Sequence, residues 1–450
     1  MTLATVNRAV WPGPIQELYR RRWCIWIVAI LAHTIGMFHR AAMAPVADRL
    51  MADFNISAAV FGSLGAAYFY IYAAMQLPSG TLADTLGPRK TLTAGLLLSI
   101  LGSLVMGLAP SFGVIYVGRL MVSFGVSVAW LSVVKVIMGW FWAREVATMT
   151  GLSVAVAHLG QIAAATPLAL LVMWAGWRMS FVAIAGLSLV LVVAIWLAVK
   201  DSPAQAGLPT IAEFEEESAA QLPESGACVI PSVAERFKMV VANKQLWPLV
   251  LVGLGSYGSY STLFHNWVVI YLMQVYDVQR DFAANLVLVA GLGIMLGAPT
   301  FGFLSDRILQ RRLPLVMSTG LSLVCLVLLT LWNAGKPPLA AVYPLCFFIG
   351  FGTGAVPITF ACVRDIVPSS VRGMASGLVN MGAFVGAAVI QPLFGYVLDL
   401  GWEGKMVEGA RVYPLGAFQQ SLMLCCGLIT LGFLGALLVR ETRCLDRAAS

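Results

Sequence analysis

Three fixed cations lie in the interior of the long apolar segments of this 450-residue chain, away from the segment ends: Arg40, Arg119 and Lys135. All four histidines also fall in these segments, whereas no Asp or Glu does. An ionisable group at bilayer depth costs at least about 2.5 kcal/mol, so it faces a partner or an aqueous cavity. The imbalance predicts a membrane protein in which an anionic solute is the missing partner.

The first apolar segment places His33 and Arg40 on one helical face, because they are separated by two helical turns. His39 is about 100° away around the same helix. A guanidinium binds two oxygens of a carboxylate or phosphate at once, which favours Arg40 as a substrate ligand. Contact of Arg40 with the outer lipid headgroups is the alternative.

Other polar side chains form candidate binding faces by their helical spacing. These are Tyr68, Tyr72 and Gln76 in the second segment, His158 and Gln161 in the fifth, and Tyr257, Ser261 and His265 in the seventh. Such groups could give the hydrogen bonds that set substrate shape. Packing between helices is the alternative for the tyrosines and for His265.

Arg119 and Lys135 lie in the fourth segment, sixteen residues apart. In a helix this spacing is about 24 Å along the axis, so the two cations cannot contact one bound solute. We expect Lys135 to extend toward the cytoplasmic end of its helix. Drawing anions inward is its alternative role.

The elements that position these residues follow from composition. Hydrophobic residues make up 60% of the chain, charged residues 11%, and the mean hydropathy is +0.86. These values indicate an integral membrane protein. Stretches of about 20 apolar residues predict membrane-spanning helices. We count twelve, at about 23–47, 57–82, 91–109, 112–142, 146–174, 178–199, 246–274, 282–304, 313–333, 340–363, 373–398 and 414–439.

Charge places the chain in the membrane. Lys and Arg concentrate in alternate loops and in the cluster 20–22, which predicts an inner (plasma) membrane protein with both termini cytoplasmic. We therefore interpret the pI of 9.0 as a topology signal, with no nucleic-acid partner. The eight cysteines show no metal-binding spacing. Neither a cofactor motif nor a paired nucleophile and base is present, so an enzyme is not expected.

A polar, proline-containing stretch divides the chain into two halves of six helices. It predicts a cytoplasmic linker. The expected organisation is an N-terminal segment 1–22, a six-helix bundle 23–200, a linker 201–245, a second bundle 246–439 and a tail 440–450.

An internal repeat relates the two halves. Residues of the loop after the second segment recur 222 positions later. Parallel six-helix repeats of this kind indicate a transporter with its site at the midplane between the halves. The paired positions are Gly80 with Gly302, Leu82 with Leu304, Asp84 with Asp306, Arg89 with Arg311, and Lys90 with Arg312.

This repeated loop, Gly80-Thr-Leu-Ala-Asp-Thr-Leu-Gly-Pro-Arg-Lys90, resembles the signature of the major facilitator superfamily. The resemblance implies an all-α fold of twelve transmembrane helices in two pseudo-symmetric bundles. Asp84 could accept hydrogen bonds from a helix N-terminus of the opposite half, while Arg89 and Lys90 hold carbonyl ends or a carboxylate. The resemblance gives this loop, and its copy at Asp306 and Arg311, a gating role.

The run 139–178 is similar to bacterial permeases of the anion:cation symporter and organophosphate type. Arg40 resembles the arginine with which anion carriers of that type hold substrate, and Arg119 resembles a coupling or gating arginine. His265 lies 225 residues after Arg40, so the two are expected to form a two-sided clamp. His39 stands where sugar-acid symporters carry an acid, so a coupled proton would be carried by a histidine.

These observations predict a monomeric secondary transporter of a small organic anion, a carboxylate above all, coupled to protons and working by alternating access. A transporter of amino acids or small peptides is the alternative within transport. A transporter-like receptor that binds its ligand without flux is the alternative outside it. No cofactor is expected for any of the three.

Overall fold

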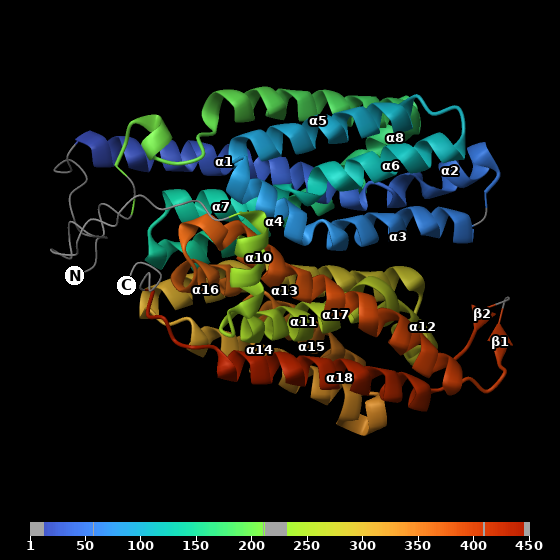
Figure 1. Ribbon diagram of the computed structural model, residues 1–450. Coiled ribbons are helices and arrows are strands. Elements are labelled where there is room, and N and C mark those ends of the chain that lie inside the picture. The colour runs from blue at the N-terminus through green and yellow to red at the C-terminus, as the bar shows by residue number, and fades with distance from the viewer. Residues whose placement is uncertain (1–12, 57, 210, 212–231, 408–409, 445–450) are drawn as a thin grey trace. The chain divides into compact units, whose positions relative to one another are not determined.

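The computed structural model describes residues 13–56, 58–209, 211, 232–407 and 410–444, with a few side chains inside these ranges excepted. Helices make up almost all of this part of the chain (Figure 1). Nine helical segments among the described residues are long and apolar enough to cross a membrane. The prediction of an all-α, multi-pass membrane protein is therefore confirmed.

Contacts divide the chain into two compact units. Unit 1 contains Met1–Trp142, Ala157–Arg236 and Ser370–Met374, and unit 2 contains Ala143–Val156, Phe237–Ser369 and Ala375–Ser450. The units differ from the predicted halves in two short segments. Residues 143–156 pack with the C-terminal helices, and residues 370–374 pack with the N-terminal ones.

Unit 1 is built from long apolar helices that pack along one another. Its helices are α1 (Gly13–Ala41), α2 (Ala47–Phe54), α3 (Ala58–Ala74), α4 (Gln76–Thr85), α5 (Pro88–Gly107), α6 (Phe112–Ser127), α7 (Ala129–Trp140) and most of α8 (Val146–Ala198), with 3-10 turns at Ala44–Val46 and Ala204–Ala206. Helix α6 contacts α5 and α3, and α1 contacts α7. A further helix, α10 (Val233–Ala242), spans the boundary between the units.

Unit 2 holds the remaining helices and one short hairpin. Its elements are α11 (Leu246–Thr262), a π-helical turn (Leu263–Trp267), α12 (Val268–Tyr276), α13 (Arg280–Ile308), α14 (Arg312–Leu331), α15 (Leu339–Thr353), α16 (Ile358–Ile366), α17 (Arg372–Leu400), β1 (Met406–Val407), β2 (Ala410–Arg411) and α18 (Leu415–Leu438), with 3-10 turns at Ala143–Glu145, Trp332–Gly335 and Ser369–Val371. Within this set, residues 370–374, which are most of the last turn and the start of α17, belong to unit 1. The two strands pair antiparallel. Helices α11 and α14 both pack on α18, and α13 packs on α15.

Several predicted spans are interrupted. The second is split into α3 and α4, the fourth into α6 and α7, and the seventh into α11, the π turn and α12. The fifth and sixth are joined in α8, which turns at Gly176, where a φ of 77° suits a residue without Cβ. The first helix begins at Gly13, so part of the predicted N-terminal segment is helical.

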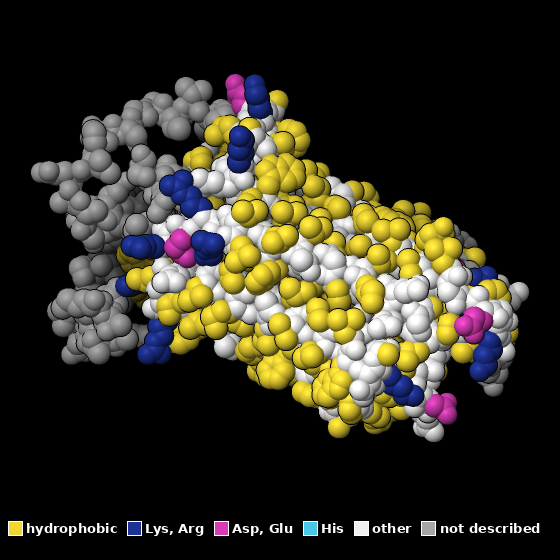
Figure 2. Space-filling model, turned by 90° about the horizontal axis from the view of Figure 1, so that it is seen from below, with side chains coloured by type: hydrophobic (Ala, Val, Ile, Leu, Met, Phe, Trp, Pro, Cys, Tyr) yellow, Lys and Arg dark blue, Asp and Glu magenta, His cyan; other side chains and the backbone are white. Residues whose placement is uncertain are grey.

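Hydrophobic side chains cover most of the face shown in Figure 2, and the visible Lys, Arg, Asp and Glu side chains lie toward its two ends. Large apolar residues such as Phe303, Leu328 and Leu438 are exposed on unit 2. An apolar surface of this extent is unfavourable in water and suits a lipid environment.

Candidate functional site

Asp84, at the end of α4, accepts hydrogen bonds from the start of another helix. Its two carboxylate oxygens accept from the backbone N–H groups of Gly373 and Met374, each at 2.9 Å. These groups belong to the first turn of α17, where N–H donors lack partners within the helix. The predicted contact of Asp84 with a helix N-terminus is confirmed.

Lys135 completes this group, the Asp84 cluster (Asp84, Lys135, Gly373 and Met374). Its ammonium donates to Oδ1 of Asp84, whose side chain is only 1% exposed. The prediction that an anionic solute is the missing partner of the membrane cations is therefore wrong for Lys135, whose partner is Asp84. Helix α4 ends at Thr85, three residues beyond the predicted apolar stretch. Asp84 is therefore part of this helix, and it lies beside Lys135 of α7.

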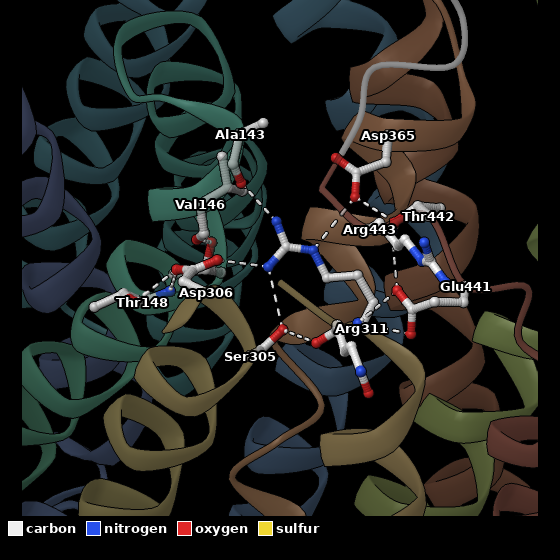
Figure 3. A network of polar contacts seen from close by, with 12 residues as sticks. Ala143, Val146, Thr148, Ser305, Asp306, Arg311, Asp365, Glu441, Thr442 and Arg443 are labelled. Carbon is white, nitrogen blue, oxygen red and sulfur yellow. Dashed lines mark hydrogen bonds and ion pairs between the residues drawn. The ribbon is translucent and has the colours of Figure 1, made fainter. Parts of the chain in front are cut away.

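Asp306 repeats the contact in unit 2 (Figure 3). Its Oδ2 accepts from both the backbone N–H and the hydroxyl of Thr148, each at 2.6 Å, near the start of α8. Arg311 donates from Nη1 to Oδ1 of Asp306 at 2.5 Å and from Nε to Asp365 at 3.3 Å. Burial alone would lower the pKa of Arg311, but the carboxylates of Asp365 and Asp306 raise it, so the guanidinium stays charged.

Glycines allow the helices to approach closely beside Asp84 and beside Asp306. A Cβ at Gly80 would lie 2.2 Å from the carbonyl oxygen of Gly373, and one at Gly302 would lie 2.4 Å from that of Ala147. Both distances are far shorter than any Cβ contact permits. The sequence repeat thus corresponds to a repeated contact: the end of α4 meets the start of α17, and the end of α13 meets the start of α8.

The cations of the two copies differ. Arg89 is the counterpart of Arg311, but it donates to the carbonyl of Trp196 at the end of α8 and lies 4.2 Å from the Trp196 ring. Its backbone N–H donates to Asp201 at 2.7 Å. The predicted contact of Arg89 with a carbonyl end is confirmed, whereas Lys90 is exposed.

The chain end after α18 joins the Asp306 cluster, which we define as Thr148, Asp306, Arg311, Asp365, Glu441 and Thr442. Glu441 accepts from the backbone N–H of Arg311 at 2.9 Å and from that of Arg312 at 2.9 Å. Thr442 donates its hydroxyl to Asp365 at 2.6 Å. Sequence reasoning missed these residues, although Asp365 lies only two positions after a predicted span.

Arg119 caps the C-terminal end of α1. It donates to the carbonyl oxygens of His39 at 2.8 Å and Arg40 at 3.4 Å, and its guanidinium lies 4.7 Å from the Tyr68 ring centre. A cation at this position satisfies the last carbonyls of the helix and its dipole. Arg119 and His39 are both 2% exposed, so this helix end is deeply buried.

The polar residues predicted on α1 and α8 come together in unit 1. His33 packs on Trp130 with ring centres 5.1 Å apart and lies within electrostatic range of His158 and Arg40. Arg40 and His158 are half-buried. The side chain of Gln161 lies outside the described residues.

The polar side chains predicted on α3 and α4 contact one another within the fold. Tyr68 and Tyr72 stack on each other with ring centres 5.9 Å apart. Gln76 is fully buried and donates to the carbonyl of Tyr72 at 2.9 Å within the same stretch of chain. The binding role of Gln76 stays a prediction.

In unit 2, Ser261 and His265 lie together as their spacing predicts, with Oγ and Nδ1 3.0 Å apart. Gln391 of α17, which sequence reasoning missed, donates from Nε2 to the Ser261 oxygen at 3.3 Å. Tyr257 packs on Phe384, with ring centres 5.8 Å apart. His265 is exposed on the π-helical turn, an element often found at functional sites.

Arg40 belongs to unit 1 and His265 to unit 2, so the predicted clamp between them stays a prediction.

Among the described residues, no three His, Cys, Asp or Glu side chains are grouped so that they could hold a metal ion. The arrangement suits reversible binding through charge and hydrogen bonds.

Two curated relatives match over nearly the whole chain. A probable sulfoacetate transporter of Cupriavidus necator is 24% identical over 443 residues, which cover 96% of this chain and 97% of the relative. A D-galactonate transporter of Escherichia coli O6:H1 is 22% identical over 419 residues, which cover 90% of this chain and 96% of the relative.

The fold is also similar to a solved structure. The proton:xylose symporter XylE, bound to 6-bromo-6-deoxy-D-glucose, matches with a TM-score of 0.68 at 14% identity, covering 95% of this chain and 98% of that one. The sequence model of the Major Facilitator Superfamily matches residues 25–391 and 266–443. The chain therefore belongs to the Major Facilitator Superfamily of membrane transporters.

Proposed function

We propose that this protein is a secondary active transporter that takes up a small organic anion, with a carboxylate as the recognised group. One observation carries the proposal. The guanidinium groups of Arg40 and Arg119 lie within electrostatic range of each other at the end of α1. Placing two like charges together in a membrane helix bundle is unfavourable, and an anion bound beside them offsets the repulsion.

The two cations have different tasks in this proposal. Arg119 holds the helix end through the carbonyls of His39 and Arg40. Arg40 is half-buried and lies on the same helix as His33. We assign to Arg40 the bidentate contact with the carboxylate, because a guanidinium matches two oxygens at once.

The comparisons support an anionic solute. Sulfoacetate and galactonate, the solutes named for the two relatives, both carry a carboxylate. A shared carboxylate suggests the part of the solute that a common arginine would bind. Sulfonates and sugar phosphates have similar charge and oxygen geometry, so they belong in the test.

Proton coupling is part of the proposal. His33 lies within electrostatic range of both His158 and Arg40. Histidine has an ordinary pKa near 6.5 and changes charge in the working pH range. We assign the proton to His158, the half-buried member of the pair, because the fully buried His33 disfavours a charge. A proton on His158 would add a positive charge to this site, so that proton binding and carboxylate binding favour each other.

The test is uptake by proteoliposomes of carboxylates, sulfonates, sugar phosphates and zwitterionic amino acids, with and without an inward proton gradient. We expect uptake of one anion class, increased by the gradient. Arg40→Gln should lower kcat/KM for that anion at least tenfold, because a charge-assisted contact contributes about 1.5–3 kcal/mol. Arg40→Lys should retain part of the activity.

Arg49→Gln is the matched control, since Arg49 is exposed and donates to the carbonyl of Val172. It removes the same charge outside the proposed site and should leave kcat/KM unchanged. Equal uptake by Arg40→Gln and Arg49→Gln proteins would refute the role of Arg40. Uptake of zwitterions alone would replace the anion with an amino acid.

The orientation and setting of the protein stay predictions. We propose cytoplasmic termini and an inner-membrane location on the basis of the basic cluster 20–22. A monomer is proposed as the working unit, and labelling of engineered termini from each side of the membrane would test the orientation.

A further inference from the structure

A hydrogen-bond chain in unit 2 runs from Gln391 through Ser261 to His265. Gln391 donates from Nε2 to the Ser261 oxygen at 3.3 Å, and that oxygen lies 3.0 Å from Nδ1 of His265. Ser261 is 2% exposed, while His265 is exposed on the π-helical turn. The chain therefore links a half-buried amide, through a buried hydroxyl, to an exposed imidazole.

The direction of this chain follows from the donors available. The amide nitrogen of Gln391 can only donate, so the Ser261 oxygen accepts from it. The hydroxyl hydrogen of Ser261 then needs an acceptor, because a buried donor left without a partner is unfavourable.

The usual acceptor for a helical hydroxyl is the carbonyl four residues earlier, and neighbouring Thr262 donates to Gly258 in this way at 2.8 Å. Within the described part of the chain, Ser261 makes no such contact with a carbonyl. The acceptor that remains is Nδ1 of His265. A nitrogen that accepts carries no proton, so neutral His265 has its proton on Nε2.

We propose that Gln391 is a positioning residue that fixes the tautomer of His265, and that His265 thereby presents a neutral Nε2–H donor to oxygen atoms of the transported solute. The identity of the ligand rests on the proposed function, whereas the tautomer of His265 does not. A neutral donor suits hydroxyl and carboxylate oxygens alike.

The chain has only four histidines, which makes a direct test practical. The protein is labelled with 15N-histidine, placed in lipid nanodiscs and studied by NMR without added solute. Single His→Gln substitutions assign each pair of ring nitrogens. We expect neutral His265 to carry its proton on Nε2 and to have a bare Nδ1.

Gln391→Glu reverses the chain, because a carboxylate accepts and cannot donate. Ser261 would then donate to the introduced carboxylate, and the His265 proton should move to Nδ1. Gln419→Glu is the matched control, since Gln419 lies in α18 of the same unit and donates to the carbonyl of Thr330 at 3.2 Å. It should leave the His265 tautomer unchanged.

A proton on Nδ1 of neutral His265 in the unaltered protein overturns the proposal, whether or not any variant folds. A Gln391→Glu protein that folds and keeps the proton on Nε2 also refutes the role of Gln391. Added D-galactonate and sulfoacetate test the ligand separately. A shift of the Nε2 signal with either solute supports binding, and the expected tautomer without any shift removes the donor role toward these solutes.

Uptake provides a second measurement. Gln391→Leu should raise KM about tenfold with a smaller change in kcat, since a misoriented donor weakens binding of the solute. Ser261→Thr keeps the hydroxyl and should preserve KM, whereas Ser261→Ala should resemble Gln391→Leu. An equal effect of Ser261→Thr and Ser261→Ala would contradict the hydrogen-bond chain.

Discussion

Lys135 and Asp84 form an ion pair in which the carboxylate is 1% exposed and the lysine side chain 21% exposed. The same carboxylate accepts from the backbone N–H of Gly373 and Met374. Asp84 therefore has one charged donor and two neutral ones. If the helix start moves away during transport, Lys135 remains as the partner that keeps the buried carboxylate neutralised.

Substitution of Lys135 tests whether its ion pair with Asp84 stabilises the protein, as distinct from the loss of a positive charge elsewhere. We expect Lys135→Gln to lower the free energy of unfolding by about 2 kcal/mol, less than the about 3–5 kcal/mol for a fully broken buried pair, because two amide donors remain. Lys135→Arg should keep most of the stability. Denaturation in detergent measures both.

Lys244→Gln is the control, since Lys244 is exposed after α10 and loses the same charge. It should change stability by less than about 0.5 kcal/mol. Equal stability of the Lys135→Gln and Lys244→Gln proteins would show that the ion pair with Asp84 contributes nothing.

The glycines of the two clusters make a steric prediction. Gly80→Ala and Gly302→Ala would place Cβ atoms 2.2 Å and 2.4 Å from carbonyl oxygens, so the helices must shift. Overpacking of this kind costs about 1–3 kcal/mol. Gly291→Ala in α13 has open space around its Cβ and should stabilise by up to about 1 kcal/mol. Denaturation midpoints that fall for all three, or for none, would contradict the close approach.

Glu441 predicts a pH dependence at the chain end. Burial alone would raise the pKa of its carboxyl, but hydrogen bonds from the backbone N–H groups of Arg311, Arg443 and Arg312 hold the pKa below the usual 4.5. A lowered acid pKa contributes stability above the unfolded value, and that stability is lost as the pH falls through the folded value. The affected window therefore lies below pH 4.5.

We expect Glu441→Gln to reduce the free energy of unfolding at neutral pH by less than about 1 kcal/mol, because the carboxyl is partly exposed. The difference from the unaltered protein should shrink as the pH falls below 4.5. Glu403→Gln, at an exposed position, is the control. A difference that stays constant from neutral to acid pH would rule out the ionised carboxylate as its source.

Two features of the molecule could be predicted from the sequence, because each follows from a regular pattern of residues. Apolar stretches predicted the spanning helices, and the repeat predicted that Asp84 and Asp306 have equivalent roles. Their contacts with Gly373 and Thr148 are equivalent, while the shared gating role stays a prediction. Both aspartates are found from a short motif because the helix ends they bind are fixed by the same repeat.

Other features depend on where helices end and on which helices meet in the fold. The apolar pattern placed Asp84 outside its span, so the partner of Lys135 was not foreseen. The capping role of Arg119 requires that α1 ends at Ala41, which hydropathy does not predict. Gln391 meets Ser261 across 130 residues of sequence, and no spacing rule links them.

The central claim is that Arg40 binds the anionic group of the solute. The most direct measurement is thermal stabilisation of the purified protein by carboxylates, sulfonates, sugar phosphates and zwitterionic amino acids, with Arg40→Gln and Arg49→Gln proteins alongside. A solute at 100 times its Kd adds about 2.7 kcal/mol to the stability of the bound state. We predict stabilisation by a carboxylate that is lost in Arg40→Gln and kept in Arg49→Gln. Equal stabilisation of all three proteins would contradict the claim.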